Sequence, residues 1–296
     1  MENIREVFGL VGDALPILNP KKKKFTVAYL GPKGTFSEQA ARRFFSNQKN
    51  IVYAEYLTIQ DVFRAVEARK ADYGVVPVEN SIEGSVNLTL DLLYQKNLKI
   101  TGEITERIEH SLIVNPLTKK SDIKIIVSHP QAIAQCRNFL AKNFPRVRFI
   151  EVESTALAVK KLKTLKKAAA IGSEYAAKIY GMKILARNIG DVKNNLTRFF
   201  ILSKKDSKPT GNDKTSLMFS LKHEPGALFK FLKPFAEKNI NLTKIESRPS
   251  KVKPWEYVFL MEFEGHRLDK KCLDVLKEAR KLCETLKVLG SYPKQT

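Results

Sequence analysis

The side chains best suited to chemistry in this sequence are small polar groups that follow an apolar run. Residues 74–87 read Gly-Val-Val-Pro-Val-Glu-Asn-Ser-Ile-Glu-Gly-Ser-Val-Asn, and the valines of residues 75–78 are typical of a buried strand. Gly84 and Ser85 then open a helical pattern. Open α/β sheets bind ligands where a strand ends and a helix begins, because free helix amides attract negative charge there. This segment therefore predicts a cradle for an anion.

Three other segments combine hydroxyl and amide side chains with predicted turns. They are Gly-Pro-Lys-Gly-Thr-Phe-Ser-Glu-Gln-Ala at 31–40, Ser-His-Pro-Gln-Ala-Ile-Ala-Gln-Cys at 128–136 and Asn-Leu-Thr-Arg-Phe at 195–199. Such groups bind and orient anions through hydrogen bonds. Each also has a structural interpretation. Thr35 has capping-box spacing to Glu38, and His129 sits where it could fix a strand-to-helix turn rather than transfer protons.

For three acidic or hydroxylic residues, both a ligand contact and a structural role are possible. Glu79 is a candidate general acid, but a carboxylate beside a bound dianion would repel it, which favours a structural role. Ser154 and Thr155 precede a helical pattern and are typical caps, although they could also contact a ligand. Asn194 and Asn195 are turn formers first.

Strands and helices alternate from Phe25 onward, which predicts parallel pairing with right-handed crossovers. The first set places strands at 26–30, 51–56 and 73–78, with helices after Thr35 and Thr58. A second set begins near residue 107, with strands at 123–127, 147–152 and 168–171. The apolar run at 199–202 returns to the first sheet. We therefore expect two lobes that face a cleft, lobe 1 at about 25–106 and 190–203 and lobe 2 at about 107–189.

A polar, turn-rich segment at 204–214 predicts a linker to a separate domain at 215–296. The pattern of this domain is strand (215–221), helix (apolar face from Leu228), strand (241–247), strand (256–263), helix (268–286) and strand (287–292). This βαββαβ order is the ferredoxin-like α+β arrangement. Residues 1–24 have weak periodicity and end in four lysines, so we expect an appended arm.

Composition excludes several classes of protein. Lys and Arg total 52 against 31 Asp and Glu, a net charge of +21, but the lysines are scattered without aromatics, so we expect no specific nucleic-acid partner. There is no apolar run of membrane-spanning length and no signal peptide, which predicts a cytoplasmic protein without membrane contact. The three cysteines and four histidines lack ligand spacing, and we expect no metal.

The four motifs together resemble the prephenate dehydratase family in order and spacing over about residues 25–202, and the C-terminal domain resembles the ACT regulatory domain. The resemblance implies an α/β catalytic domain with the two-lobed, type II periplasmic-binding-protein-like fold. It also implies decarboxylating dehydration of prephenate to phenylpyruvate in phenylalanine biosynthesis. No cofactor is required, because the electrons freed from the ring carboxylate expel the C4 hydroxyl and the ring becomes aromatic.

The resemblance also assigns roles to residues. It implies Thr197 at the leaving hydroxyl, with Asn80, Ser128 and Gln135 as the other catalytic positions, and substrate contacts from Thr35, Ser81, Ser154, Thr155 and Arg198. Arg198 is the best carboxylate partner if its side chain faces the cleft. In a strand, however, Thr197 and Arg198 point to opposite faces, so both reach the ligand only if the backbone turns there.

Regulation follows from the resemblance of the C-terminal domain. Its motifs for binding L-phenylalanine match Gly226, Ala227, Leu228, Glu246, Ser247, Arg248 and Pro249. We expect Glu246 to receive the amino group and a homodimer or homotetramer to form through ACT domains. Phe229 stands where the family often has valine. Two alternatives remain: arogenate dehydratase, which shares these motifs, and a non-catalytic sensor of small anions or amino acids.

Overall fold

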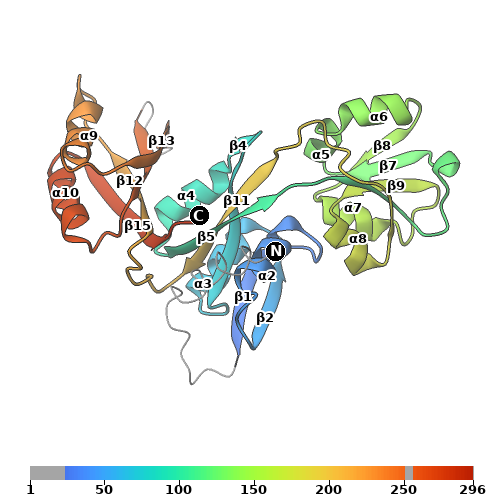
Figure 1. The fold of residues 1–296 in the computed structure, drawn as a ribbon, viewed down its shortest axis with the longest axis horizontal. Coiled ribbons are helices and arrows are strands. Elements are labelled where there is room, and N and C mark those ends of the chain that lie inside the picture. Colours follow the sequence, from blue (N-terminus) through green and yellow to red (C-terminus); the bar gives the residue numbers. More distant parts are fainter. Residues whose placement is uncertain (1–23, 251–255, 296) are drawn as a thin grey trace, which may run out of the picture.

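The computed structural model describes residues 24–250 and 256–295, and the arm expected at 1–24 lies outside this range except for Lys24. Three sheets organise the molecule (Figure 1). Two belong to the two lobes expected between residues 25 and 203. The third belongs to the C-terminal domain that resembles the ACT domain, for which we keep that name. No helix in the described ranges is long and apolar enough to cross a membrane.

Lobe 1 is built on a sheet that is buried on both faces. Its strand order is β2-β1-β3-β11-β5, and β4 pairs with β3. Alternate valines of β3 belong to different cores: Val75 packs on the α2 side, whereas Val76 and Val78 pack on the side of α3 and α4. The elements are β1 (Phe25–Leu30), α2 (Phe36–Phe44), β2 (Ile51–Tyr56), α3 (Ile59–Glu67), β3 (Tyr73–Asn80), β4 (Gly84–Ser85), α4 (Asn87–Gln95), β5 (Lys99–Arg107) and β11 (Leu196–Ser203).

Lobe 2 is a second α/β unit with strand order β10-β6-β9-β7-β8. Two segments connect the lobes, 108–110 after β5 and 187–195 before β11, and β11 returns to the sheet of lobe 1 as the sequence predicts. The elements are β6 (Ser111–Val114), η1 (Lys120–Asp122), β7 (Ile125–Ser128), α5 (Pro130–Ala134), α6 (Arg137–Asn143), β8 (Arg148–Glu151), α7 (Thr155–Lys161), β9 (Ala168–Gly172), α8 (Glu174–Tyr180) and β10 (Lys183–Ala186). This is the two-lobed, periplasmic-binding-protein-like arrangement.

The ACT domain has the expected βαββαβ order on a sheet β13-β14-β12-β15. Its helices cover one face of that sheet. The other face packs on lobe 1, where β15 passes so close to β5 that a Cβ atom on Gly290 would lie 2.1 Å from the Ile100 carbonyl oxygen. The elements are β12 (Asp213–Ser220), α9 (Ala227–Glu237), β13 (Leu242–Pro249), β14 (Tyr257–Glu264), α10 (Lys270–Lys281) and β15 (Thr285–Pro293).

Two local expectations differ from the structure. Gly84 and Ser85 do not open a helix; they form the short strand β4, in which Gly84 has φ +80°, and α4 begins at Asn87. The segment 204–214 also buries more than its composition suggests, since the Ser207 hydroxyl donates to the Thr101 carbonyl. Side-chain hydrogen bonds of this kind allow polar residues to be buried without an apolar pattern.

Candidate active site

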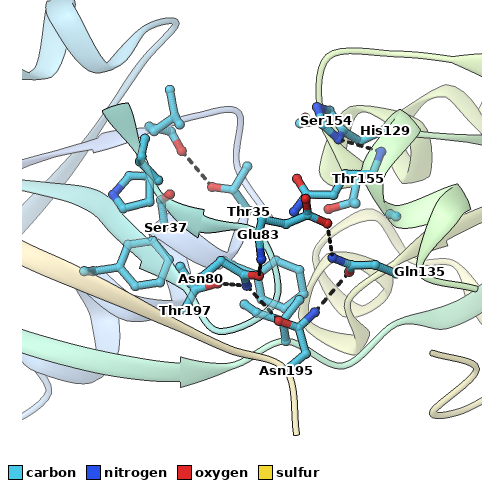
Figure 2. Close-up of a pocket in the computed structure, with 18 of the residues that line it drawn as sticks. Thr35, Ser37, Asn80, Glu83, His129, Gln135, Ser154, Thr155, Asn195 and Thr197 are labelled. Carbon is cyan, nitrogen blue, oxygen red and sulfur yellow. Dashed lines mark hydrogen bonds between the residues drawn. The ribbon is translucent and has the colours of Figure 1, made fainter. Parts of the chain in front are cut away.

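A cavity of about 340 Å³ lies between the lobes. Its walls come from both lobes and from both connecting segments, which contribute Ile108, His110 and Asn195. In Figure 2, Thr35, Ser37, Asn80 and Thr197 lie on the side of lobe 1, and His129, Gln135, Ser154 and Thr155 on the side of lobe 2. A molecule bound here would contact both lobes.

Thr197 and Asn80 form the centre of the lobe 1 wall. They are paired residues of the neighbouring strands β11 and β3, so their side chains share one face of the sheet. Asn80 Nδ2 donates to Thr197 Oγ1 at 2.8 Å and to Asn195 Oδ1 at 2.7 Å. Because the Thr197 oxygen accepts from Asn80, its own proton is left to donate into the pocket.

Asn80 is itself fixed by the turn that follows it. Its Oδ1 accepts from the backbone N–H groups of Ile82 and Glu83 at 3.0 and 3.1 Å. These two bonds identify Oδ1 as the acceptor and Nδ2 as the donor toward Thr197. The turn after β3 therefore orients the amide, and the amide orients the hydroxyl.

A chain of hydrogen bonds along the pocket wall links the lobes (Figure 2). Gln135 Oε1 accepts from Asn195 Nδ2 at 3.0 Å and lies 3.0 Å from His110 Nε2, while Gln135 Nε2 donates to Glu83 at 3.2 Å. Burial lowers the pKa of His110, so its ring is neutral near pH 7. Since Oε1 is an acceptor, His110 donates from Nε2. This chain ties residues of lobe 1, lobe 2 and both connections.

Three hydroxyls on the pocket wall belong to helix starts. Thr35 caps α2 by accepting from Glu38 N and also donates to the Leu30 carbonyl at 2.8 Å. Ser154 caps α7 by accepting from Leu157 N at 3.1 Å, and Thr155 is the first residue of that helix. For Thr35 and Ser154 the capping role is thus present, and both residues also line the pocket.

The charges that line the pocket are negative. Among the described residues that line it there are two carboxylates, Glu83 and Glu153, and no lysine or arginine. Neutral hydroxyls and amides supply the donors, and Phe36, Pro77 and Phe199 add apolar surface. A bound carboxylate would therefore meet hydrogen-bond donors rather than an ion pair.

Two predicted residues lie behind the wall. Ser128 is fully buried, and its hydroxyl donates to the Ile171 carbonyl of β9 at 2.7 Å. Ser81 donates to the Asn194 carbonyl at 3.2 Å and accepts from Leu196 N at 2.9 Å. Neither belongs to the residues that line the pocket, so both support the backbone around it.

Arg198 points away from the cleft, because β11 keeps its strand alternation at Thr197 and does not turn. The expectation of a substrate carboxylate partner at Arg198 is therefore not met. Its guanidinium makes two bonds to Glu262 of the ACT domain, at 2.7 and 2.8 Å, and pairs with Glu79 at 3.1 Å. We call this group the interdomain charge cluster; its members are Glu79, Glu103, Arg198, Lys214, Lys244 and Glu262.

The cluster is held together by opposite charges in a buried position. Burial alone would raise the pKa of Glu262, but Arg198 and Lys214 lower it below its ordinary value. Burial would likewise lower the pKa of Arg198, which Glu262 instead raises. Both groups are thus ionised, and Glu79 is a partner of this cluster rather than an acid in the pocket.

Sequence reasoning missed part of the pocket. Asn195, which the sequence predicts as a turn former, and His110 and Glu83, for which it predicts no role, all belong to the hydrogen-bond chain with Gln135. The available signal for Asn195 was its place in the Asn-Leu-Thr-Arg-Phe motif. For His110 the local sequence offers no signal, because its partner Gln135 is in another element.

The expected regulatory residues divide into two groups. Ala227 and Leu228 line a cavity of about 560 Å³, which we call the ACT cavity, and Gly226 precedes α9 with φ +78°. Glu246 and Arg248 instead face lobe 1: Glu246 accepts from the Ser85 hydroxyl at 2.6 Å, and Arg248 pairs with Asp91. Ser247 and Pro249, which alternate with them on β13, are exposed.

Known proteins share these sequence and structural features. The chain matches the prephenate dehydratase family over residues 27–207 and the ACT domain family over 215–281. It is 51% identical to the bifunctional chorismate mutase/prephenate dehydratase of Aquifex aeolicus, covering 92% of this chain and 75% of that protein. It is 46% identical to the prephenate dehydratase of Methanocaldococcus jannaschii, covering 90% and 97%.

A solved structure agrees over both domains. The prephenate dehydratase from Arthrobacter aurescens, in complex with L-Phe, superposes with a TM-score of 0.83 at 33% identity, covering 91% of this chain and 90% of that one. The match includes the catalytic lobes and the ACT domain. With its two-lobed cleft and C-terminal βαββαβ domain, the chain belongs to the prephenate dehydratase family.

Proposed function

We propose that the pocket between the lobes converts prephenate to phenylpyruvate, water and carbon dioxide, with Thr197 at the leaving C4 hydroxyl. One observation carries this assignment: Asn80 donates to Thr197 Oγ1, which leaves the threonine proton available to a molecule in the pocket. A hydrogen bond aimed at the atom where negative charge develops lowers the barrier of the chemical step.

The reaction balances without a cofactor. The bond between the ring and its carboxylate breaks, and its electron pair enters the ring as carbon dioxide leaves. The C4–O bond then breaks with its electrons on oxygen, and this hydroxide takes up one proton to become water. Thr197 donates the hydrogen bond to that oxygen. A free threonine hydroxyl is a very weak acid, so alignment rather than acidity is its contribution.

The absence of a cation among the described pocket residues suits the carboxylate that is lost. An ion pair would stabilise the reactant carboxylate, whose charge disappears in the reaction, and would raise the barrier. The hydroxyls of Ser154 and Thr155 and the amide of Gln135 offer neutral hydrogen bonds instead, whereas Thr35 donates its proton to the Leu30 carbonyl. The first three residues orient the substrate without forming an ion pair with its carboxylate.

Regulation by L-phenylalanine is part of the same proposal. The related Arthrobacter protein was solved with L-Phe, and the ACT domain of this chain carries Ala227 and Leu228 on the wall of the ACT cavity. Gly226, Ser247 and Pro249 belong to the same proposed regulatory set. Glu246 and Arg248, expected in it from the sequence, instead contact Ser85 and Asp91 of lobe 1, so Glu246 is not assigned to the amino group. We expect L-phenylalanine to favour a less active arrangement of the lobes.

We further propose that two copies of the chain associate through their ACT domains, as a dimer or within a tetramer. β13 is an edge strand of its sheet, and its side chains facing away from lobe 1 are exposed, including Ile245 at 44%. An exposed edge strand with an apolar side chain is suited to pairing with another strand. The cytoplasmic location expected from the sequence belongs to the same proposal.

Arogenate dehydratase remains the second candidate, and one observation favours it. Arogenate carries an ammonium group where prephenate has a keto oxygen, and the carboxylates of Glu83 and Glu153 line the pocket. Glu83 accepts from Gln135 through Oε1, and Glu153 is the second carboxylate that could pair with the ammonium group. A comparison of the two substrates separates these candidates.

The proposed role of Thr197 predicts a loss of turnover without a loss of binding. We expect Thr197→Val to lower kcat by about 10²- to 10³-fold, because the hydrogen bond to the leaving oxygen is gone. The dissociation constant for prephenate, measured by calorimetry on this slow variant, should change by only about threefold. Thr197→Ser retains a hydroxyl and serves as the matched control.

Two outcomes would contradict the assignment. Wild-type turnover by Thr197→Val would exclude the threonine hydroxyl from the reaction. A wild-type chain that binds prephenate and releases no phenylpyruvate would instead support the non-catalytic sensor.

A further inference from the structure

Helix α4 connects the two cavities of the molecule. The segment that leads into it, Gly84 to Val86, lines the active-site pocket, and Tyr94 in its last turn lines the ACT cavity. The helix has nine residues, or about 13 Å at the usual rise per residue. Between these ends it is packed in the core shared by lobe 1 and the ACT sheet. A short, well-packed helix moves as one body, so its two ends are mechanically connected.

The ACT domain holds the first end of α4 through β13. The Ser85 hydroxyl donates to Glu246 at 2.6 Å, and Arg248 donates to the Asn87 carbonyl at 3.1 Å and pairs with Asp91. The side chains of Arg248 and Asp91 are only 7% and 18% exposed, so this contact is shielded from water. The residues that precede and begin α4 are therefore fixed to the strand that carries Glu246.

The ACT domain holds the second end of α4 through β15. Lys287 Nζ donates to the carbonyl oxygens of Leu93, Tyr94 and Lys96 at 2.9, 2.8 and 2.6 Å. The last carbonyls of a helix lack partners within it and carry the negative end of its dipole, so an ammonium group is well placed there. One lysine of the ACT domain thus caps a helix of the catalytic domain.

This attachment distinguishes α4 from the other helices of lobe 1. Within the residues that the structure describes, α2 and α3 make no hydrogen bond or ion pair to the ACT domain. Their polar partners lie in the two lobes, as for Arg43 with Glu106, Arg64 with Asp61 and Glu38 with Tyr175. α4 is bound to that domain at both ends.

We propose that α4 transmits the state of the ACT domain to the substrate pocket, with Ser85 as the positioning residue at its catalytic end and Lys287 as its attachment at the other. The inference rests on the proposed regulation by L-phenylalanine. A shift of β13 or β15 against lobe 1 moves α4, and with it the wall at Gly84 to Val86. By linkage, occupancy of the pocket changes affinity at the ACT domain by the same factor.

The attachment at Lys287 is tested with a matched pair of partly buried interdomain lysines. Lys287→Met removes the cap on α4. Lys99→Met is the control, because Lys99 Nζ also crosses the interface, donating at 2.8 Å to the Val288 carbonyl, but makes no hydrogen bond to α4 among the described residues. Lys287→Arg tests rescue by a retained positive charge. The readouts are phenylalanine binding by equilibrium dialysis and prephenate turnover at saturating phenylalanine.

The proposal predicts that Lys287→Met changes the inhibition of turnover by phenylalanine and not the binding of phenylalanine. Lys287→Met should still bind phenylalanine, and its residual turnover at saturating phenylalanine should exceed that of the wild type by roughly fivefold or more. Lys99→Met and Lys287→Arg should be inhibited like the wild type. Equal inhibition of Lys287→Met and the wild type would overturn the role of α4. A wild type that phenylalanine neither binds nor inhibits would overturn the proposed regulation itself.

Hydrogen exchange on the wild-type chain provides a test that needs no variant to fold. Addition of phenylalanine should change amide exchange in peptides covering 84–96 and leave those covering α3, 59–67, unchanged. Unchanged exchange at 84–96 in a chain that phenylalanine inhibits would overturn the inference.

Discussion

Asn80 orients the Thr197 hydroxyl, and a substitution at Asn80 tests this role. It accepts from two backbone amides through Oδ1, which leaves Nδ2 directed at Thr197 and Asn195. Asn80→Ala removes that donor, so the Thr197 hydroxyl is free to rotate away from the leaving oxygen. The residue positions the catalytic hydroxyl and need not touch the reacting atom.

We expect Asn80→Ala to lower kcat for prephenate by about 10²-fold while KM changes by only about threefold. Steady-state kinetics measure both values. Asn115→Ala is the control, since Asn115 donates to the Leu162 carbonyl in lobe 2 and does not line the pocket. A rise in KM with unchanged kcat would show that Asn80 binds substrate and does not position Thr197.

Among single residues, the sequence placed most of the predicted site residues in the pocket correctly, but not all of them. Thr35, Asn80, Gln135, Ser154, Thr155 and Thr197 line it, whereas Ser81, Ser128 and Arg198 do not. Ser128 lies at the carboxyl end of β7, where ligands bind, but its hydroxyl is used by the neighbouring strand. Whether a hydroxyl faces a cleft or a carbonyl depends on strands brought together by the fold, and sequence patterns do not encode that contact locally.

Among the elements, the paired strands β3 and β11 each direct side chains both to the cleft and to the ACT domain. Their paired residues alternate, so Asn80 and Thr197 face the cleft while Glu79 and Arg198 face the ACT domain. The alternation of β11 predicted opposite faces for Thr197 and Arg198. In β3, by contrast, the register shift between Glu79 and Pro77 brings Asn80 to the cleft face. The interdomain charge cluster follows from this division. What the sequence could not supply was Glu262, the partner from a domain more than sixty residues away.

Glu262 therefore stabilises the attachment of the ACT domain to β11. Glu262→Leu leaves Arg198 and Lys214 buried without their main partner, and we expect a loss of about 3–5 kcal/mol in the free energy of unfolding. Chemical denaturation measures it. Glu264→Leu, two residues along β14 in a partly exposed pair with Lys294, should cost at most about 1 kcal/mol. Similar values for the two variants would contradict a structural role for the cluster.

For the molecule as a whole, periodicity and motif order predicted two α/β lobes and a βαββαβ domain, and both are present. The packing between the domains was not predictable, because the apolar face of the ACT sheet has the pattern of any half-buried sheet. The whole chain has a net charge of +21, yet the described residues that line the pocket include no lysine or arginine. The contribution of this charge to an anionic substrate is long-range attraction rather than direct contact.

The central claim, that this chain dehydrates prephenate, is tested most directly by its specificity between prephenate and arogenate. The measurement is kcat/KM of the full chain for each substrate under identical conditions, with phenylpyruvate and phenylalanine as the products followed. We predict a kcat/KM for prephenate about tenfold or more above that for arogenate. A higher value for arogenate, or no product from prephenate, would contradict the account.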